Sequence, residues 1–386
     1  MSTMRYLSLD FYRGLTIALM IVVNNPGTWA FVYPPLEHAT WHGCTPTDLV
    51  FPSFLFIVGV SLWFSLSKFN RQPGPEVTRK LLRRTALIFL VGLALNAYPF
   101  IGKDWGALRI MGVLQRIALA YGLGAFLCVW LSRQTLLITG GLLLAVYWTL
   151  LHLGGGNDPY ALAYNLPRLI DLQVLTGRHM YGGFGIAFDP EGLLATVPAA
   201  VTLIIGYLAG SLIGQHSPAQ PAADGDEGAA APAAAHPYAL LHDLMWYGTT
   251  LGAAGLLWGL VFPINKPLWT SSYVLYAGGL SMIALAACIW ALDFKGWTRL
   301  AKPFLVFGAN PLFAFVLSGL LLKTINLLKY TDEGGMTRNG QHWLYQHLFY
   351  PIQQGEFGSL LYALAYTALI WLLCWVLYRR KIFIKI

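Results

Sequence analysis

Two polar residues in the segment HATWHGCTPTDLVFP, residues 38–52, could carry acid–base chemistry. Histidine has an ordinary pKa of about 6.5, so His38 could act as a general base or a nucleophile at neutral pH, and the carboxylate of Asp48 could orient it. However, Thr45, Pro46 and Asp48 also match a helix-capping box, and an isolated loop histidine is more often inert. Catalysis and capping are therefore both open for this segment.

Paired amides interrupt the first apolar stretch of the chain. Asn24 and Asn25 precede Pro26 and Gly27, and Asn24 lies about 15 Å along a helix that begins near Gly14 at the inner interface. A polar group at that depth is costly and marks a candidate site. The helix breaker that follows favours an unwound segment that lines a cavity. A proline kink whose amides bond neighbouring helices explains the same residues.

The run RIMGVLQR places two arginines on one predicted helix. Arg109 and Arg116 are seven residues apart, so they are expected to project from nearly the same helix face. Arg109 could simply extend to the interface. Arg116 lies about 10 Å below it and needs an anionic partner, which could be a carboxylate or the phosphate of a ligand.

Two further segments bring charges to the same face of the membrane. In FDPEG, residues 188–192, Asp189 is a plausible helix cap, and Glu191 would complement the helix dipole. In PINKPLW, residues 263–269, Lys266 and Trp269 are residue types that commonly sit at the interface. We expect one group of polar residues in the outer half of a bundle, made of Asn24, His38, Asp48, Arg109, Glu191 and Lys266. No glycine-rich phosphate loop, metal-ligand spacing or serine-nucleophile motif competes with it.

These residues must be positioned by membrane helices. Of the 386 residues 56% are hydrophobic and 11% charged, whereas soluble domains carry about a quarter charged residues. Apolar runs long enough to cross a bilayer recur along the chain. We predict an all-α polytopic membrane protein of about ten transmembrane helices, at residues 10–33, 47–67, 84–101, 109–131, 135–153, 191–213, 239–262, 268–292, 303–328 and 358–378.

The basic residues predict the orientation. With the N-terminus inside, sixteen of the 25 Lys and Arg fall on the inner face and seven on the outer face, so both termini are expected in the cytoplasm. The net charge of +8 follows this pattern and forms no continuous basic face for nucleic acid. The four cysteines are scattered, which indicates neither a disulfide framework nor a metal site.

The chain is expected to form one transmembrane domain, residues 1–386. Residues 214–237, rich in Ala, Pro and Gly, predict a flexible cytoplasmic linker between two five-helix halves, 1–213 and 238–386. The first apolar stretch has no small-x-small cleavage pattern after it, so we interpret it as a retained helix.

The sequence resembles the transmembrane acetyltransferases related to the lysosomal heparan-alpha-glucosaminide N-acetyltransferase, especially their bacterial NagX-type members. The matching motifs run from the first helix to the last residue. They are LDFYRG at 9–14, VVNNPG at 22–27, HATWHG at 38–43, DLVFP at 48–52, RIMGVLQR at 109–116, FDPEG at 188–192, INKPLWTSSYV at 264–274, GANP at 308–311 and YRRKIFIKI at 378–386.

The resemblance implies transfer of acetyl from cytoplasmic acetyl-CoA to a glucosamine amine on the opposite side of the membrane. The family's essential histidine falls on His38 and its active-site asparagine on Asn24, and Asp48 matches a nearby family acid. We assign Arg109, Arg116 and Asn25 to the coenzyme. The residues assigned to the sugar are Asp189, Glu191, Lys266 and Trp269. Acetyl-CoA is expected as a co-substrate, without a metal.

Compared with the lysosomal enzyme, the outer loops are shorter and a large lumenal N-terminal region is missing, so a small amino sugar is the expected acceptor. The expected location is the bacterial inner membrane, and a homodimer is one possible assembly. An amino-sugar transporter would also use a broken helix with buried amides. An O-acetyltransferase of a surface polysaccharide would keep the chemistry and change the acceptor.

Overall fold

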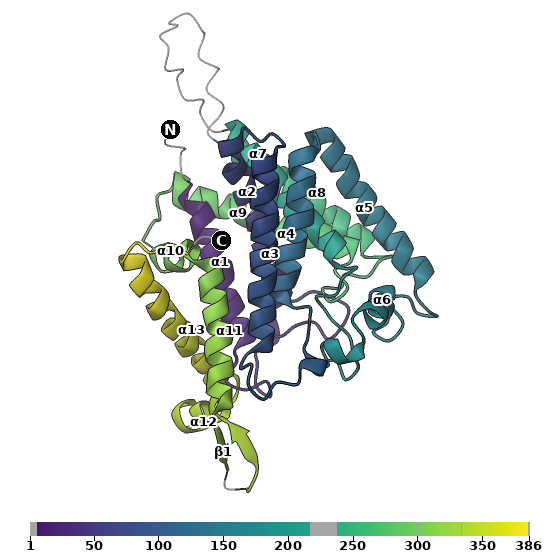
Figure 1. Cartoon of the computed structure of the whole chain (residues 1–386). Coiled ribbons are helices and arrows are strands. Elements are labelled where there is room, and N and C mark those ends of the chain that lie inside the picture. The colour runs from purple at the N-terminus through teal and green to yellow at the C-terminus, as the bar shows by residue number, and fades with distance from the viewer. Residues whose placement is uncertain (1–5, 217–237, 300, 333, 385–386) are drawn as a thin grey trace, which may run out of the picture.

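The computed structural model describes residues 6–216, 238–299, 301–332 and 334–384, and they form a bundle of long α-helices (Figure 1). The helices that build the bundle are α1 (Leu7–Asn24), α2 (Val50–Leu66), α3 (Pro75–Ala97), α4 (Val113–Trp130), α5 (Arg133–Gly154), α7 (Thr196–His216), α8 (Ala239–Trp258), α9 (Ser271–Ile289), α10 (Lys302–Ala309), α11 (Pro311–Leu327) and α13 (Gly355–Arg379).

Shorter elements fill the connections between them. They are the one-turn helices η1 (Pro34–Leu36), η2 (Pro46–Leu49), η3 (Ser67–Phe69), η4 (Trp105–Ala107) and η5 (Gly177–His179), the π-helical turns η6 (Trp290–Phe294) and η7 (Tyr345–Phe349), and the helices α6 (Leu166–Val174) and α12 (Gly340–Leu344). Strands β1 (Lys329–Thr331) and β2 (Thr337–Asn339) pair antiparallel in a small hairpin.

Seven helices in the described part of the chain are long and apolar enough to cross a membrane, or eight if α10 and α11 form one span bent by 85°. Each of the ten predicted segments coincides with one helix or with this bent pair. Helix α3 lies outside the seven because its first half carries five charged side chains, and α8 because its His, Asp, Thr, Tyr and Gly residues lower its mean hydropathy. The number of ten crossings and the cytoplasmic location of both termini therefore stay predictions.

Two predicted boundaries near the amides and the arginines are wrong. Helix α1 ends at Asn24 instead of continuing to residue 33, because Pro26 and Gly27 follow directly. Helix α4 begins at Val113, so Arg109 lies in an extended segment before it and does not share a helix face with Arg116. This segment is held by Asn96, whose amide donates to the carbonyl oxygens of Arg109 (3.0 Å) and Met111 (3.1 Å).

Two other boundaries also differ from the prediction. Helix α3 begins at Pro75, nine residues before the predicted residue 84, with Glu76 in its first turn. Proline at the first helical position and an early acid are ordinary start signals, which the search for apolar runs missed. Helix α7 begins at Thr196, so Asp189 and Glu191 lie in a turn before it and do not cap it. It ends at His216, so residues 214–216 of the predicted linker, 214–237, belong to the helix, and residues 217–237 lie outside the described residues.

Close helix crossings hold the bundle together at small residues. A side-chain carbon on Gly59 of α2 would lie 2.0 Å from the carbonyl oxygen of Leu203 in α7, and one on Gly206 of α7 would lie 1.9 Å from that of Phe56 in α2. Glycine permits this approach because it has no Cβ, as is common between membrane helices. Helices α1 and α10 cross in the same way at Gly14 and Gly308.

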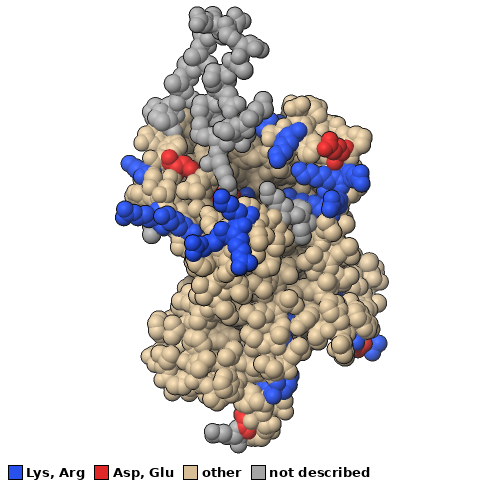
Figure 2. Space-filling model, turned by 60° about the vertical axis from the view of Figure 1, so that its left-hand side comes forward, with Lys and Arg blue, Asp and Glu red and all other residues tan. Residues whose placement is uncertain are grey.

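The charged side chains divide the molecule into two ends. Most Lys and Arg visible in Figure 2 form a band toward the end where α1 and α3 begin, and the surface below the band is almost free of charge. We call this the basic end. We call the opposite end, where α1 stops and α2 begins, the loop end.

Candidate active site

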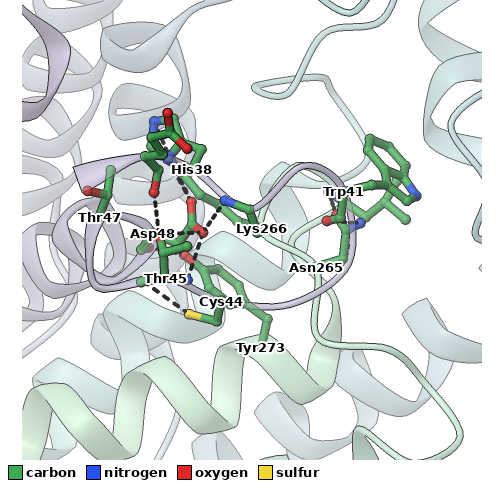
Figure 3. Close-up of polar contacts among 12 residues, drawn as sticks. His38, Trp41, Cys44, Thr45, Thr47, Asp48, Asn265, Lys266 and Tyr273 are labelled. Carbon is green, nitrogen blue, oxygen red and sulfur yellow. Dashed lines mark hydrogen bonds and ion pairs between the residues drawn. The ribbon is translucent and has the colours of Figure 1, made fainter. Parts of the chain in front are cut away.

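Three side chains meet at the loop end of the bundle (Figure 3). The imidazole Nδ1 of His38 lies 2.7 Å from Oδ1 of Asp48 and 3.0 Å from Nζ of Lys266. Lys266 Nζ also lies 3.5 Å from the same Asp48 oxygen. The Asp48 side chain is buried, whereas that of His38 is 42% exposed. A reagent at the loop end can therefore reach the imidazole, and the carboxylate behind it is shielded from water.

The two carboxylate oxygens of Asp48 have different roles: Oδ2 caps the start of η2, and Oδ1 contacts His38 and Lys266. Oδ2 accepts hydrogen bonds from the backbone amides of Ala39 and Thr45, both at 3.0 Å, and from the Thr45 hydroxyl at 3.1 Å. The predicted capping box is confirmed, at the start of η2. Oδ1 stays available for His38 and Lys266. The hydroxyl of Tyr273 donates to the Asp48 carbonyl oxygen at 2.5 Å, which fixes the backbone as well.

Lys266 reaches this site because its loop is bound to the loop that carries His38. The amide of Gly43 donates to the carbonyl oxygen of Ile264 at 2.7 Å, and the buried side chain of Asn265 donates to the carbonyl oxygen of Trp41 at 2.9 Å. The Lys266 side chain is only 18% exposed. Burial lowers the pKa of Lys266, although the negative charges of Asp48 and Glu191 oppose this effect.

Trp269, which the sequence interpretation assigned to the sugar, is buried beneath the turn that carries Lys266. Its ring is fully buried, and its indole N–H donates to the hydroxyl of Thr202 at 3.1 Å. The backbone of Trp269 has φ +52°, and its amide donates to the Lys266 carbonyl oxygen at 2.9 Å. Trp269 therefore anchors the turn that presents Lys266, and any effect on a substrate would be indirect.

Arg109 is paired with the two acids that were predicted for the sugar. Its Nε and one terminal nitrogen bond both oxygens of Asp189 (3.0 and 2.7 Å), and the same terminal nitrogen bonds Glu191 at 2.5 Å. Such bidentate pairs are among the stronger ionic contacts. The geometry favours the ion-pair alternative, because two carboxylates already bond this guanidinium.

Arg116 is fully buried, and its bonded partners are backbone carbonyl oxygens, not the anion that the sequence argument required. One terminal nitrogen donates to the carbonyl oxygens of Pro190 (3.0 Å) and Gly192 (3.1 Å), and the guanidinium carbon lies 5.2 Å from the Trp269 ring centre. Arg116 thus supports two segments of the site from behind. Its Nε and other terminal nitrogen have no hydrogen-bond partner among the described residues.

The two amides at the end of α1 form no hydrogen bond with His38, Asp48 or Lys266 in the described structure. Asn24 is exposed and forms no side-chain hydrogen bond with any residue that the structure describes. Asn25 is buried and donates to the carbonyl oxygen of Ile21 in its own helix at 2.6 Å. The expected unwinding after Asn24 is present, but the expected contact of Asn25 with a coenzyme has no support from this geometry.

A second candidate site lies at the basic end. A cavity of about 450 Å³ is lined by Arg13, Lys80 and Arg84, by serines of α2, and further in by apolar residues such as Met20 and Leu114. No acid lines it. Lys80 and Arg84 form no hydrogen bond or ion pair with described residues, and the Arg84 guanidinium lies 4.7 Å from the Tyr121 ring centre. Arg13 is bonded to Asp10 and Ser61.

The sequence interpretation missed this cavity because it placed the start of α3 at residue 84. Once Pro75 is taken as the first helical residue, Lys80 and Arg84 are four apart and fall on one face of α3.

Among the described residues, no group of three or more His, Cys, Asp or Glu could hold a metal ion.

Known proteins resemble this chain over nearly its whole length. A family model described as heparan-alpha-glucosaminide N-acetyltransferase, catalytic, matches residues 5–229. The heparan-alpha-glucosaminide N-acetyltransferase of Homo sapiens is 26% identical over 446 aligned residues, which cover 99% of this chain and 60% of the human protein. The protein of the same name from Mus musculus is 26% identical over 445 residues, covering 100% of this chain and 61% of the mouse protein.

The chain thus spans about three fifths of the length of these relatives. The family match takes in α1, the His38–Asp48 segment, α3, α4 and α7, so both candidate sites lie largely within it. With its apolar helices, this relationship makes the chain a multi-pass membrane protein. Because the family model covers more than half of the sequence, the chain belongs to the heparan-alpha-glucosaminide N-acetyltransferase catalytic family.

Proposed function

We propose that this protein transfers an acetyl group from acetyl-CoA to the amine of a glucosamine-type sugar, with His38 as the catalytic base. The observation that carries the proposal is the exposed His38 imidazole, held at 2.7 Å by the buried carboxylate of Asp48. The family relationship supports the reaction class, since the matched relatives are named as N-acetyltransferases of a glucosaminide.

The hydrogen bond to Asp48 determines which nitrogen of His38 acts. An ionised carboxylate only accepts hydrogen bonds, so we assign the proton of the neutral imidazole to Nδ1. The contact of Lys266 Nζ with that nitrogen, at 3.0 Å, is then an electrostatic contact and not a hydrogen bond. Nε2 is then the basic atom. The sugar amine attacks the thioester carbonyl carbon, and its proton passes to Nε2. The carbon–sulfur bond breaks, and the departing thiolate takes up a proton. In the alternative relay Nε2 itself forms the first bond to the acetyl carbon.

Lys266 would stabilise the negative charge that develops on the thioester oxygen. Its ammonium is 3.0 Å from the His38 ring and is partly shielded from water, where such a charge is more effective than in solution. The sequence interpretation assigned Lys266 to the sugar and placed Asn24 in the active site by resemblance to the family. Asn24 remains a candidate donor because its exposed amide ends α1 with no partner among the described residues.

The cavity at the basic end suits the coenzyme. Acetyl-CoA carries several phosphate charges and a long, weakly polar pantetheine arm. Lys80 and Arg84 offer unpaired positive charge near the mouth, and Met20 and Leu114 line the deeper part. We place the phosphates at the basic end and the arm through the bundle toward His38. With the basic end in the cytoplasm of a bacterial inner membrane, the coenzyme need never cross the bilayer.

Sealed proteoliposomes of known orientation test this proposal. Acetyl-CoA should support the reaction only from the basic end and glucosamine only from the loop end, with N-acetylglucosamine identified by mass spectrometry. If both substrates are required on one face, the threaded arrangement is wrong. An O-acetylated product would show that the acceptor is a hydroxyl group and not an amine. Movement of labelled glucosamine across the membrane without acetyl-CoA would show that the protein is a transporter and not an enzyme.

A further inference from the structure

Two sequence motifs have no role so far, GANP at 308–311 and YRRKIFIKI at 378–386. The first motif and residues 378–384 of the second come together at the basic end. Asn310 lies at the break between α10 and α11 and is fully buried. Its Nδ2 donates to the carbonyl oxygen of Ile382 at 3.0 Å, and its Oδ1 accepts from the amide of Ile384 at 2.7 Å. One side chain thus uses both ends of its amide to hold the chain segment after α13.

The chain turns sharply to reach Asn310. After α13 the amide of Ile382 donates to the Leu377 carbonyl oxygen at 2.9 Å, and that of Lys381 donates to Tyr378 at 3.1 Å. Lys381 has φ +56°, the left-handed conformation that usually favours glycine at a helix end. The chain therefore leaves the helix axis at Lys381 and continues as residues 382–384, which we call the tail.

The tail separates two cavities. Ile384 lines the cavity that contains Lys80 and Arg84. Lys381 and Phe383 line a neighbouring cavity of about 880 Å³, and Arg13 lines both. Arg13 is itself bonded to the Gly308 carbonyl oxygen at 3.3 Å, within the motif that holds the tail. The tail and Arg13 together form the wall between the two spaces.

This wall carries apolar side chains that the protein leaves uncovered. Ile382 is 44% exposed, Phe383 47% and Ile384 44%, although Asn310 fixes their backbone. Ile384 therefore combines a fixed backbone with an exposed apolar side chain, in the same cavity as the cations of Lys80 and Arg84. This combination suits an amphipathic ligand. The cations would hold phosphates, and the apolar side chain would contact the less polar part of the same molecule.

We propose that the tail forms one wall of the coenzyme site, with Ile384 in contact with the pantetheine arm and Asn310 as a positioning residue that acts through the tail. This inference rests on the proposed function, because it assumes that the cavity with Lys80 and Arg84 holds the coenzyme. It adds the C-terminal residues of the chain to that site.

The test compares Ile384→Ser with Ile382→Ser in the full-length protein. Both change an equally exposed isoleucine of the tail, but only Ile384 lines the cationic cavity. Calorimetry would measure binding of CoA and of adenosine 3′,5′-bisphosphate, which lacks the pantetheine arm. We expect Ile384→Ser to weaken CoA binding about tenfold and to leave the bisphosphate unaffected. Ile382→Ser should change neither.

Asn310→Ala should reproduce the loss of CoA affinity, with the sugar KM unchanged. Because Asn310 is buried, its variant could fail to fold, and the Ile384 comparison then decides. Equal CoA affinity of Ile384→Ser and Ile382→Ser would overturn the inference and leave the proposed function standing. A wild-type protein that binds no CoA would overturn both.

Discussion

The two candidate sites differ in how their charges are compensated. At the loop end, the charges of Asp48 and Lys266 compensate each other beside His38, and Arg109 is paired with Asp189 and Glu191. At the basic end, Lys80 and Arg84 line a cavity without an acidic partner in the described part of the chain. The charges at the loop end neutralise one another without a ligand. The positive charge in the cavity at the basic end is neutralised only when an anionic ligand binds.

The difference has an energetic basis. Fixed, paired charges stabilise a transition state without having to reorganise, which is the basis of electrostatic catalysis. Unpaired cations in a partly enclosed space cost free energy until a counterion arrives, so they contribute mainly to binding. The loop end should therefore control kcat and the basic end the KM for acetyl-CoA.

The largest effect is expected at His38. His38→Ala removes the proposed base and should lower kcat by about 10³-fold, within the range typical of a general base. Binding of CoA, measured by calorimetry, should be unchanged because the cavity lies at the other end. His347→Ala serves as the control, since His347 is exposed in η7, contacts Trp343 one turn earlier and has no proposed role. Turnover of His38→Ala close to that of the control would remove His38 from the mechanism.

Lys266 offers a sharper test of preorganisation. Lys266→Met keeps the length and apolar stem but removes the ammonium, and kcat should fall by about 10²-fold, as on loss of an oxyanion donor. Lys266→Arg keeps the charge with a different shape and should recover part of the rate. A rise in sugar KM with unchanged kcat would instead make Lys266 a substrate-binding residue, as the sequence first indicated.

At the basic end the effect should appear in KM. Arg84→Ala removes one unpaired cation and should raise the KM for acetyl-CoA about tenfold, equivalent to about 1.4 kcal/mol of binding free energy, with kcat unchanged. The effect should shrink as salt is added. Arg83→Ala, one residue away and outside the cavity lining, is the matched control. Equal responses of the two variants would mean that Arg84 contributes only general surface charge.

Local sequence signals predicted the elements and one feature of the site. Hydropathy located the ten apolar segments, and the T-P-x-D pattern predicted the cap that holds Asp48. Hydropathy placed the start of α3 too late, since charged residues of an amphipathic first half dilute the apolar signal. The pairing of Arg109 with Asp189 spans 80 residues, and that of His38 with Lys266 spans 228. No periodicity of one segment encodes contacts between segments so far apart.

The smallest predicted effect is on protein stability and concerns the buried carboxyl group of Asp171. Asp171 in α6 accepts a hydrogen bond from the Leu193 amide at Oδ1, while its buried Oδ2 has no partner among the described residues. Burial raises the pKa of Asp171 from 3.8 to about 6, although the Leu193 amide and Arg116 oppose the shift. No ligand can reach this oxygen, so its missing partner should cost stability instead of serving binding.

The effect of Asp171 on the free energy of unfolding depends on pH. The folded state holds the proton more tightly than the unfolded state, so the stability of the wild type should fall as pH rises from about 4 to about 6 and then level off. Asp171→Asn mimics the protonated acid and keeps the oxygen that accepts from Leu193. It should stabilise the protein at pH 7.5 by about 1 kcal/mol, against an upper limit of about 3 kcal/mol from about 1.4 kcal/mol per pKa unit. At pH 4 the gain should vanish. Thermal unfolding of both proteins in detergent at the two pH values would measure this difference. A gain that is equal at both pH values would show that Asp171 does not titrate in this range, which would contradict the prediction.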